Sequence, residues 1–172
     1  ADEDDGILYS SNNSGDIFKW DLHTGRLLKK RLVSRKNPPN GISLITLSPD
    51  KKHIFVAVDH ENAQLLAKKD FETVKIFPEE LMTCPYAVFS PDGKYLVCAG
   101  DYGSTNIWLA DSGKLVCKVE GTRDIIKAVG LTPDQRYLSL FGTFQRLFVV
   151  DLENCKIVWR WDEAAQQAPV EK

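Results

Sequence analysis

A three-residue turn motif recurs at a fixed interval, and this recurrence restricts the fold more than any other feature of the sequence. Ser48-Pro49-Asp50, Ser90-Pro91-Asp92 and Thr132-Pro133-Asp134 follow one another at intervals of 42 residues. Each motif separates two apolar segments of strand length. Proline presets the backbone for a tight turn, and the aspartate side chain caps that turn. We therefore expect a repeat protein in which each 42-residue period is one group of antiparallel strands.

Each period contains four segments that alternate or cluster apolar residues as β-strands do. In the clearest period they read "YAVF", "KYLVCAG", "TNIWL" and "GKLVCKV". The third segment ends at an anchor position, which we assign as follows: Trp20, Lys69, Trp108 and Val150. This assignment makes the second period three residues longer than the third, around "DHENAQ" at 59–64. No amphipathic helical pattern interrupts the strands, so the predicted fold class is all-β.

Two stretches resemble WD40 repeats, "SSNNSGDIFKWDLHTGRLL" and "LVCAGDYGSTNIWLADSGKLV". Both place a glycine (Gly15, Gly103) five residues before a tryptophan (Trp20, Trp108). The resemblance covers residues 6–162 and implies a WD40-like β-propeller with about four four-stranded blades. The blades would span 6–33 (incomplete), 41–78, 84–120 and 124–162, followed by a flexible tail at 163–172. The family's Gly-His pair is absent, and its buried aspartate is matched well only by Asp101, so apolar packing should hold these blades together.

The first unit begins at its second strand, "GILYSS". Because propellers of this kind usually close with about seven blades, we expect this chain to be part of a larger propeller. The remaining blades would come from the same chain or from another one, including a second copy. A ring of four blades that closes on itself is the alternative.

Composition excludes several classes of protein. The net charge is −2, which provides no overall field for nucleic acid or anionic membranes. No apolar run is long enough to span a membrane, and the N-terminal "ADEDDG" is not a signal peptide. The cysteines form no CxxC pair, so we expect no metal site and reduced thiols in an intracellular protein, cytoplasmic or nuclear. These cysteines are Cys84, Cys98, Cys117 and Cys155.

The sequence contains none of the catalytic motifs GxSxG, HExxH, the P-loop or GxGxxG. Its aspartates stand mainly in turns, where they cap the backbone. We therefore predict a protein that is not an enzyme and needs no cofactor. A propeller enzyme with a central ring of carboxylates remains an alternative, although the required repetition of acidic positions is not found.

The predicted function is a protein-interaction scaffold in a multi-subunit complex, with rim loops that contact partner proteins. The candidate partner-binding residues are Arg31, Arg35, Lys36, His60, Tyr102, Arg123, Phe144 and Arg146. Tyr102 and Phe144 stand at loop tips, where an aromatic side chain makes a good interface anchor. A second hypothesis is a nucleoprotein component in which the basic segment Lys29–Lys36 contacts RNA or DNA.

Overall fold

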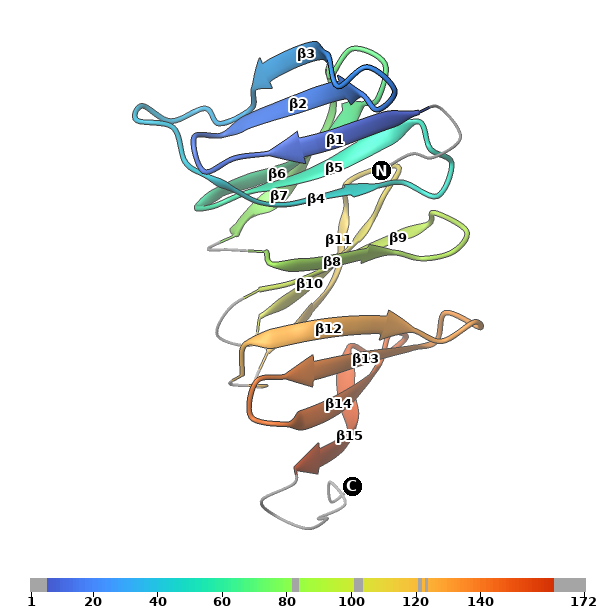
Figure 1. Cartoon of the computed structure of the whole chain (residues 1–172). Helices are drawn as coiled ribbons and strands as arrows, with labels where there is room; N and C mark the ends of the chain where they lie inside the picture. Colours follow the sequence, from blue (N-terminus) through green and yellow to red (C-terminus); the bar gives the residue numbers. More distant parts are fainter. Residues whose placement is uncertain (1–5, 82–83, 101–103, 121, 123, 163–172) are drawn as a thin grey trace. The chain divides into compact units, whose positions relative to one another are not determined.

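The computed structural model describes residues 6–81, 84–100, 104–120, 122 and 124–162, and it consists of β-strands joined by short turns (Figure 1). No helix is present among these residues, which confirms the predicted all-β fold class. Within the same ranges, no helix could therefore cross a membrane.

The strands form four antiparallel sheets in which neighbouring strands are consecutive in sequence (Figure 1). Sheet I comprises β1 (Ile7–Ser11), β2 (Asp16–Asp21) and β3 (Leu27–Leu32). Sheet II comprises β4 (Ile42–Leu47), β5 (His53–Val58), β6 (Glu61–Ala67) and β7 (Thr73–Leu81). Sheet III comprises β8 (Tyr86–Phe89), β9 (Tyr95–Ala99), β10 (Thr105–Leu109) and β11 (Leu115–Val119). Sheet IV comprises β12 (Ile126–Leu131), β13 (Tyr137–Gly142), β14 (Arg146–Asp151) and β15 (Lys156–Asp162).

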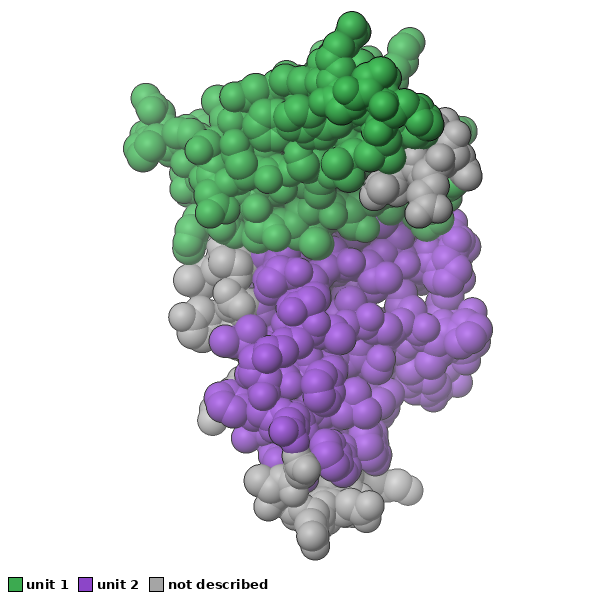
Figure 2. Space-filling model, in the orientation of Figure 1, with its two compact units in different colours: residues 1–83 green, residues 84–172 purple. Residues whose placement is uncertain are grey.

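The chain divides into two compact units, residues 1–83 with sheets I and II and residues 84–172 with sheets III and IV (Figure 2). Each unit has a core between its two sheets. In the first unit Ile17 of sheet I packs with Val56 and Leu66 of sheet II. In the second unit the buried apolar residues of sheets III and IV form one continuous cluster. Burying these side chains between two sheets supplies the main stabilisation of each unit.

The recurring motif makes the same turn in each period. The amide of the residue after the motif donates a hydrogen bond to the carbonyl of its serine or threonine, at 2.8–2.9 Å. That residue has a positive φ in all three cases: Lys51 (56°), Gly93 (74°) and Gln135 (59°). The aspartate accepts the amide two residues later, for example Lys94 N to Asp92 Oδ1 at 2.9 Å. The repetition seen in the sequence is therefore a repetition of backbone conformation.

The structure corrects the anchor of the second period. In sheets II, III and IV the first residue after the third strand donates its amide to the residue before the second strand, and in sheet II this is Lys68 to Lys52. The equivalent bond of the three-stranded sheet I runs from Leu22, after β2, to Gly6, before β1. Leu66, and not Lys69, therefore corresponds to Trp108 and Val150. Leu66 lies 18 residues after Ser48, the same spacing as Trp108 from Ser90. The second period has no extra residues at 59–64, so the inferred insertion was wrong.

The prediction of reduced cysteines was also wrong. Cys84 is bonded to Cys98, and Cys117 is bonded to Cys155. The first disulfide lies within sheet III and its N-terminal approach, whereas the second joins β11 to the β14–β15 hairpin. Stable disulfides are typical of oxidising compartments, so the cysteines no longer support an intracellular location.

The capped turns predict a pH-dependent contribution to stability. Hydrogen bonds from the Ser90 hydroxyl and the Lys94 amide hold the pKa of Asp92 below its ordinary value. Because the native pKa is depressed, this contribution is present above the unfolded pKa of about 3.9 and is lost as the pH falls through the native pKa. Asp92→Ala should lower the urea midpoint at neutral pH, and this difference from wild type should shrink in acid. Ser90→Ala removes a donor to Asp92 and also the acceptor of the Tyr95 amide, so its loss should shrink in acid only in part. A difference that is constant from pH 7 into acid would contradict the argument.

Candidate partner-binding site

The turn between β13 and β14 presents an exposed aromatic side chain. β13 ends at Gly142 and β14 begins at Arg146, so Thr143, Phe144 and Gln145 form the connection. Gln145 reverses the chain with a φ of 54°. The Phe144 side chain is 65% exposed, the highest value among the exposed large hydrophobic residues of the described chain. Such exposure of a large ring at a loop tip requires explanation, because burial would be favourable by a few kcal/mol.

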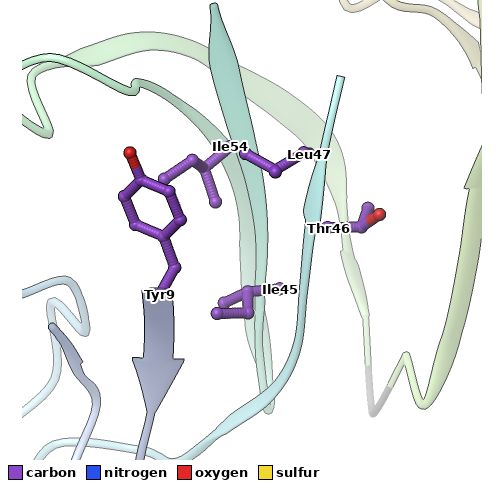
Figure 3. Close-up of a pocket in the computed structure, with 5 residues that line it drawn as sticks. All are labelled: Tyr9, Ile45, Thr46, Leu47 and Ile54. Atoms are coloured by element: carbon purple, nitrogen blue, oxygen red, sulfur yellow. The ribbon is translucent and has the colours of Figure 1, made fainter. Parts of the chain in front are cut away.

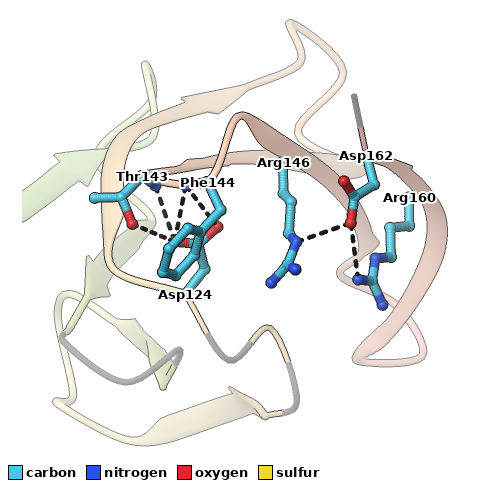
Figure 4. A network of polar contacts seen from close by, with 6 residues as sticks. All are labelled: Asp124, Thr143, Phe144, Arg146, Arg160 and Asp162. Atoms are coloured by element: carbon cyan, nitrogen blue, oxygen red, sulfur yellow. Dashed lines mark hydrogen bonds and ion pairs between the residues drawn. The ribbon is translucent and has the colours of Figure 1, made fainter. Parts of the chain in front are cut away.

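A buried carboxylate fixes this turn (Figure 4). Asp124, which is only 2% exposed, immediately precedes sheet IV. Its Oδ1 accepts the Thr143 amide at 2.9 Å and the Thr143 hydroxyl at 2.6 Å, and the Phe144 amide donates to the same carboxylate at 3.4 Å. The backbone that leads into Phe144 is thereby held by hydrogen bonds to one buried carboxylate. Ordering the loop in advance reduces the entropy that a partner must overcome on binding.

Gly142 allows the carboxylate to approach the turn. A Cβ atom at this position would lie 2.1 Å from Asp124 Oδ2, much closer than nonbonded atoms can come. Any larger residue would displace Asp124 and release the turn. Glycine is therefore required for close packing here.

One guanidinium group lies over the ring, and a second lies beyond Asp162 (Figure 4). The Arg146 guanidinium lies 5.4 Å from the centroid of Phe144, within the range of a cation–π contact. Arg146 Nε donates to Asp162 Oδ2 at 2.9 Å, and Arg160 Nη2 lies 3.4 Å from the same oxygen. Arg146 and Arg160 share one carboxylate, so these three groups keep one positive charge, and the buried Asp124 carries the compensating negative charge. Phe144, Arg146, Arg160, Asp124 and Asp162 are hereafter called the Phe144 site.

The arrangement favours recognition over chemistry. It combines an exposed aromatic ring, a fixed backbone and an exposed cation, the features that dominate binding energy at protein interfaces. Asp124 is fully occupied as an acceptor from the turn, and Asp162 pairs with arginines, so neither is arranged as a general base. Among the described residues, no group of three or more potential metal ligands is present.

A second set of candidate residues gathers around the loop between β3 and β4. Glu61 accepts the Ser34 hydroxyl at 2.5 Å and the Arg35 amide at 2.9 Å. Lys36 Nζ donates to the carbonyl of His60 at 2.6 Å. Arg35, Lys36 and His60 are therefore brought together in the first unit, and Glu61, which is buried, organises them. All three side chains are polar, so this group offers no large apolar anchor to a partner.

Arg31 has a different environment from the other candidates. Its guanidinium donates to the Phe71 carbonyl and to Thr73 Oγ1, the latter at 2.8 Å. It thus ties β3 of sheet I to the hairpin between β6 and β7 of sheet II. Phe71 has a φ of 64° and corresponds to Cys155 of sheet IV, where φ is 56°. At this position of the repeat, an arginine joins the two sheets of the first unit, and a disulfide joins the two sheets of the second unit.

Tyr102 and Arg123 lie outside the described residues. The sequence reasoning included Phe144 and Arg146 but missed Asp124, Asp162 and Glu61, which hold the loops in place. An acidic residue directly before a sheet, opposite a glycine at the end of the second strand, is the signal that could have identified Asp124.

The first unit also contains a pocket of about 360 Å³ (Figure 3). Its lining residues come from β1, β4 and β5: Tyr9, Ile45, Thr46, Leu47 and Ile54. None of the five carries a carboxylate, amine, imidazole or thiol, and the hydroxyls of the lining belong to Tyr9 and Thr46. The pocket lies beside β1, which is an edge strand in sheet I.

No protein-family model matches this chain.

Proposed function

We propose that this chain is a WD40-like partial β-propeller that acts as a non-catalytic scaffold for partner proteins. Four consecutive antiparallel sheets with a common turn at each 42-residue step support the repeat architecture. The Gly15–Trp20 spacing and its counterpart near Trp108 support the resemblance to WD40 repeats. In such an architecture the loops on one rim are free to contact partners while the sheets stay rigid.

One observation carries the proposed function. The Phe144 ring is exposed although its backbone is rigidly held by a buried carboxylate. A ring that served only the core would turn inward, and a loop without a role would need no such support. We infer a partner with an apolar pocket for the ring and acidic groups for Arg146 and Arg160.

The nucleic-acid hypothesis has less support. Within the basic segment, Lys30 pairs with Asp16 at 3.0 Å and Arg31 is bound to sheet II. Lys36 is bound to the carbonyl of His60. These contacts leave fewer cations available to phosphates than the sequence suggests. The two disulfides favour an oxidising compartment as the place of action, in place of the intracellular location expected from the sequence.

Peptides selected from a random display library on the wild-type protein provide the test. Their dissociation constants would be measured with wild type, Phe144→Ala and the control Val74→Ala, whose side chain is exposed on β7. We expect acidic peptides with a bulky apolar residue, and about tenfold or greater weakening by Phe144→Ala, as for an interface hot spot. Binders that do not distinguish Phe144→Ala from wild type, or a failure to select any binder, would overturn the proposal.

A further inference from the structure

Sheet I of the first unit and sheet IV of the second unit each carry one half of a sheet-to-sheet interface. Within the second unit, sheets III and IV meet through one face of each. We call the face of sheet III its trailing face: Val97, Ala99, Ile107, Cys117 and Val119. We call the face of sheet IV its leading face: Leu138, Leu140, Phe148, Val150 and Leu152. All ten residues are buried where the faces meet.

Strand pairing identifies the corresponding leading face of sheet I. Leu138 pairs with Val150 and Leu140 with Phe148 in sheet IV, and Leu8 pairs with Trp20 and Ser10 with Phe18 in sheet I. Leu22 and Leu152 correspond because each follows its strand and donates its amide to the residue before the paired strand, Gly6 before β1 and Arg136 before β13. The leading face of sheet I is therefore the following set: Leu8, Ser10, Phe18, Trp20 and Leu22.

This leading face is incompletely covered. Leu22 is 45% exposed, whereas its counterpart Leu152 is 9% exposed against sheet III. The other four residues are half-buried, although their counterparts in sheet IV are buried. The hairpin beside them is open as well, since a Cβ at Gly25 would meet no atom within 4 Å.

The trailing face of sheet IV follows from the same pairing. Ile107 pairs with Cys117 in sheet III, and Val149 pairs with Trp159 in sheet IV. This gives the trailing face of sheet IV as Ser139, Phe141, Val149, Trp159 and Trp161. Trp159 is 43% exposed, whereas its counterpart Cys117 is 3% exposed. Phe141 is 40% exposed, whereas its counterpart Ala99 is fully buried. Large rings replace small residues at a face that the described residues leave partly exposed.

We propose that the trailing face of sheet IV binds the leading face of sheet I of a second copy of this chain. The occupant is identified by the repeat itself, because the contact between sheets III and IV shows which face covers a trailing face. The only leading face left uncovered among the described residues is that of sheet I. The Cys117–Cys155 disulfide also has a counterpart at the proposed contact. Trp159 occupies the position of Cys117 in the repeat, and Gly25 occupies the position of Cys155. A tryptophan ring at that position has an open hairpin to pack on.

The contact is heterologous, because each copy contributes a different face. Such contacts form closed rings or open chains, depending on the rotation between copies. Each face is mainly apolar and aromatic, so its burial would supply the driving force for association. This inference does not depend on partner binding by Phe144, because the two proposals are tested with different variants and different measurements, although Arg160 and Asp162 of the Phe144 site lie on β15 beside Trp159.

Sedimentation velocity over a wide concentration range tests the proposal with the full chain and two variants. We expect wild type to self-associate, and Trp159→Arg and Leu22→Arg each to lower the association constant by about tenfold or more. Both positions are exposed, and circular dichroism would verify that both variants fold. Val74→Arg, which adds the same charge at an exposed site on β7, should associate as wild type does.

Mixing the two variants distinguishes this contact from others. Trp159→Arg keeps an intact leading face and Leu22→Arg keeps an intact trailing face, so the mixture should form a complex that neither variant forms alone. A contact between two identical faces would leave one of the variants associated and would overturn the proposal. Wild type that remains monomeric at every concentration, through closure within one chain or cover by another segment, would overturn it as well. Loss of peptide binding by Phe144→Ala would be unaffected by either result.

Discussion

Gly15→Ala should destabilise the first unit by about 3 kcal/mol, through a left-handed backbone and a steric clash that act together. Gly15 has a φ of 77°, a conformation that costs an L-residue about 1–2 kcal/mol. A Cβ atom there would lie 2.7 Å from the Asn40 carbonyl oxygen and 2.7 Å from Ser34 Cβ. Neither is the end of a flexible side chain. The Ser34 hydroxyl is itself bound to buried Glu61, so the loop cannot yield without breaking that network.

Gly25→Ala is the matched control. Gly25 has a similar φ of 69°, but no atom lies within 4 Å of its ideal Cβ position. Gly25→Ala should therefore lower the free energy of unfolding only by the cost of the backbone conformation, about 1–2 kcal/mol. Urea unfolding would be followed by hydrogen exchange of peptides from residues 6–81, which reports on the first unit separately. Equal losses of unfolding free energy for the two variants would contradict this prediction, because they would show that the clash at Gly15 is relieved at no cost.

The parts of the fold that sequence could predict are those set by local chemistry. The recurring proline and aspartate specify a turn through contacts within a few residues, such as that between Ser90 and Asp92. The alternation of apolar residues along a strand is equally local. Both therefore led to the all-β class. The anchor of sheet II was assigned wrongly at Lys69, although the 18-residue spacing from the motif to Trp108 already points to Leu66; the bond from the Lys68 amide to Lys52 confirms Leu66.

The candidate site divides in the same way. Phe144 and Arg146 were recognised because a loop tip can be read from its neighbours in sequence. Asp124 acts on Thr143 from 19 residues away, and its role depends on which turn lies beside the start of sheet IV. The orientation of the Arg31 side chain also depends on sheet II, because its hydrogen-bond partner Thr73 is 42 residues away in sequence. Long-range polar contacts leave little trace in a single sequence.

The disulfide between Cys117 and Cys155 should carry the largest share of covalent stabilisation in the second unit. It closes a sequence separation of 38 residues, which corresponds to about 3–4 kcal/mol in the loop-entropy description. Its Cα atoms lie 5.6 Å apart, a usual separation for a disulfide. It also joins the buried Cys117 of sheet III to a hairpin of sheet IV, so its loss would loosen the contact between the two sheets.

The double variant Cys117→Ser/Cys155→Ser should therefore lower the free energy of unfolding of the second unit by about 3–4 kcal/mol. The control, Cys84→Ser/Cys98→Ser, removes a bond that spans 14 residues and joins no two sheets. The control should cost less free energy of unfolding and should leave hydrogen exchange at the β14–β15 hairpin close to that of wild type.

A reducing agent should lower the stability of wild type but not that of a variant that lacks all four cysteines. Peptide mapping without reduction should recover the linked pairs. Wild type whose unfolding does not respond to the reductant would show that these cysteines are thiols, and the proposed oxidising compartment would then be wrong.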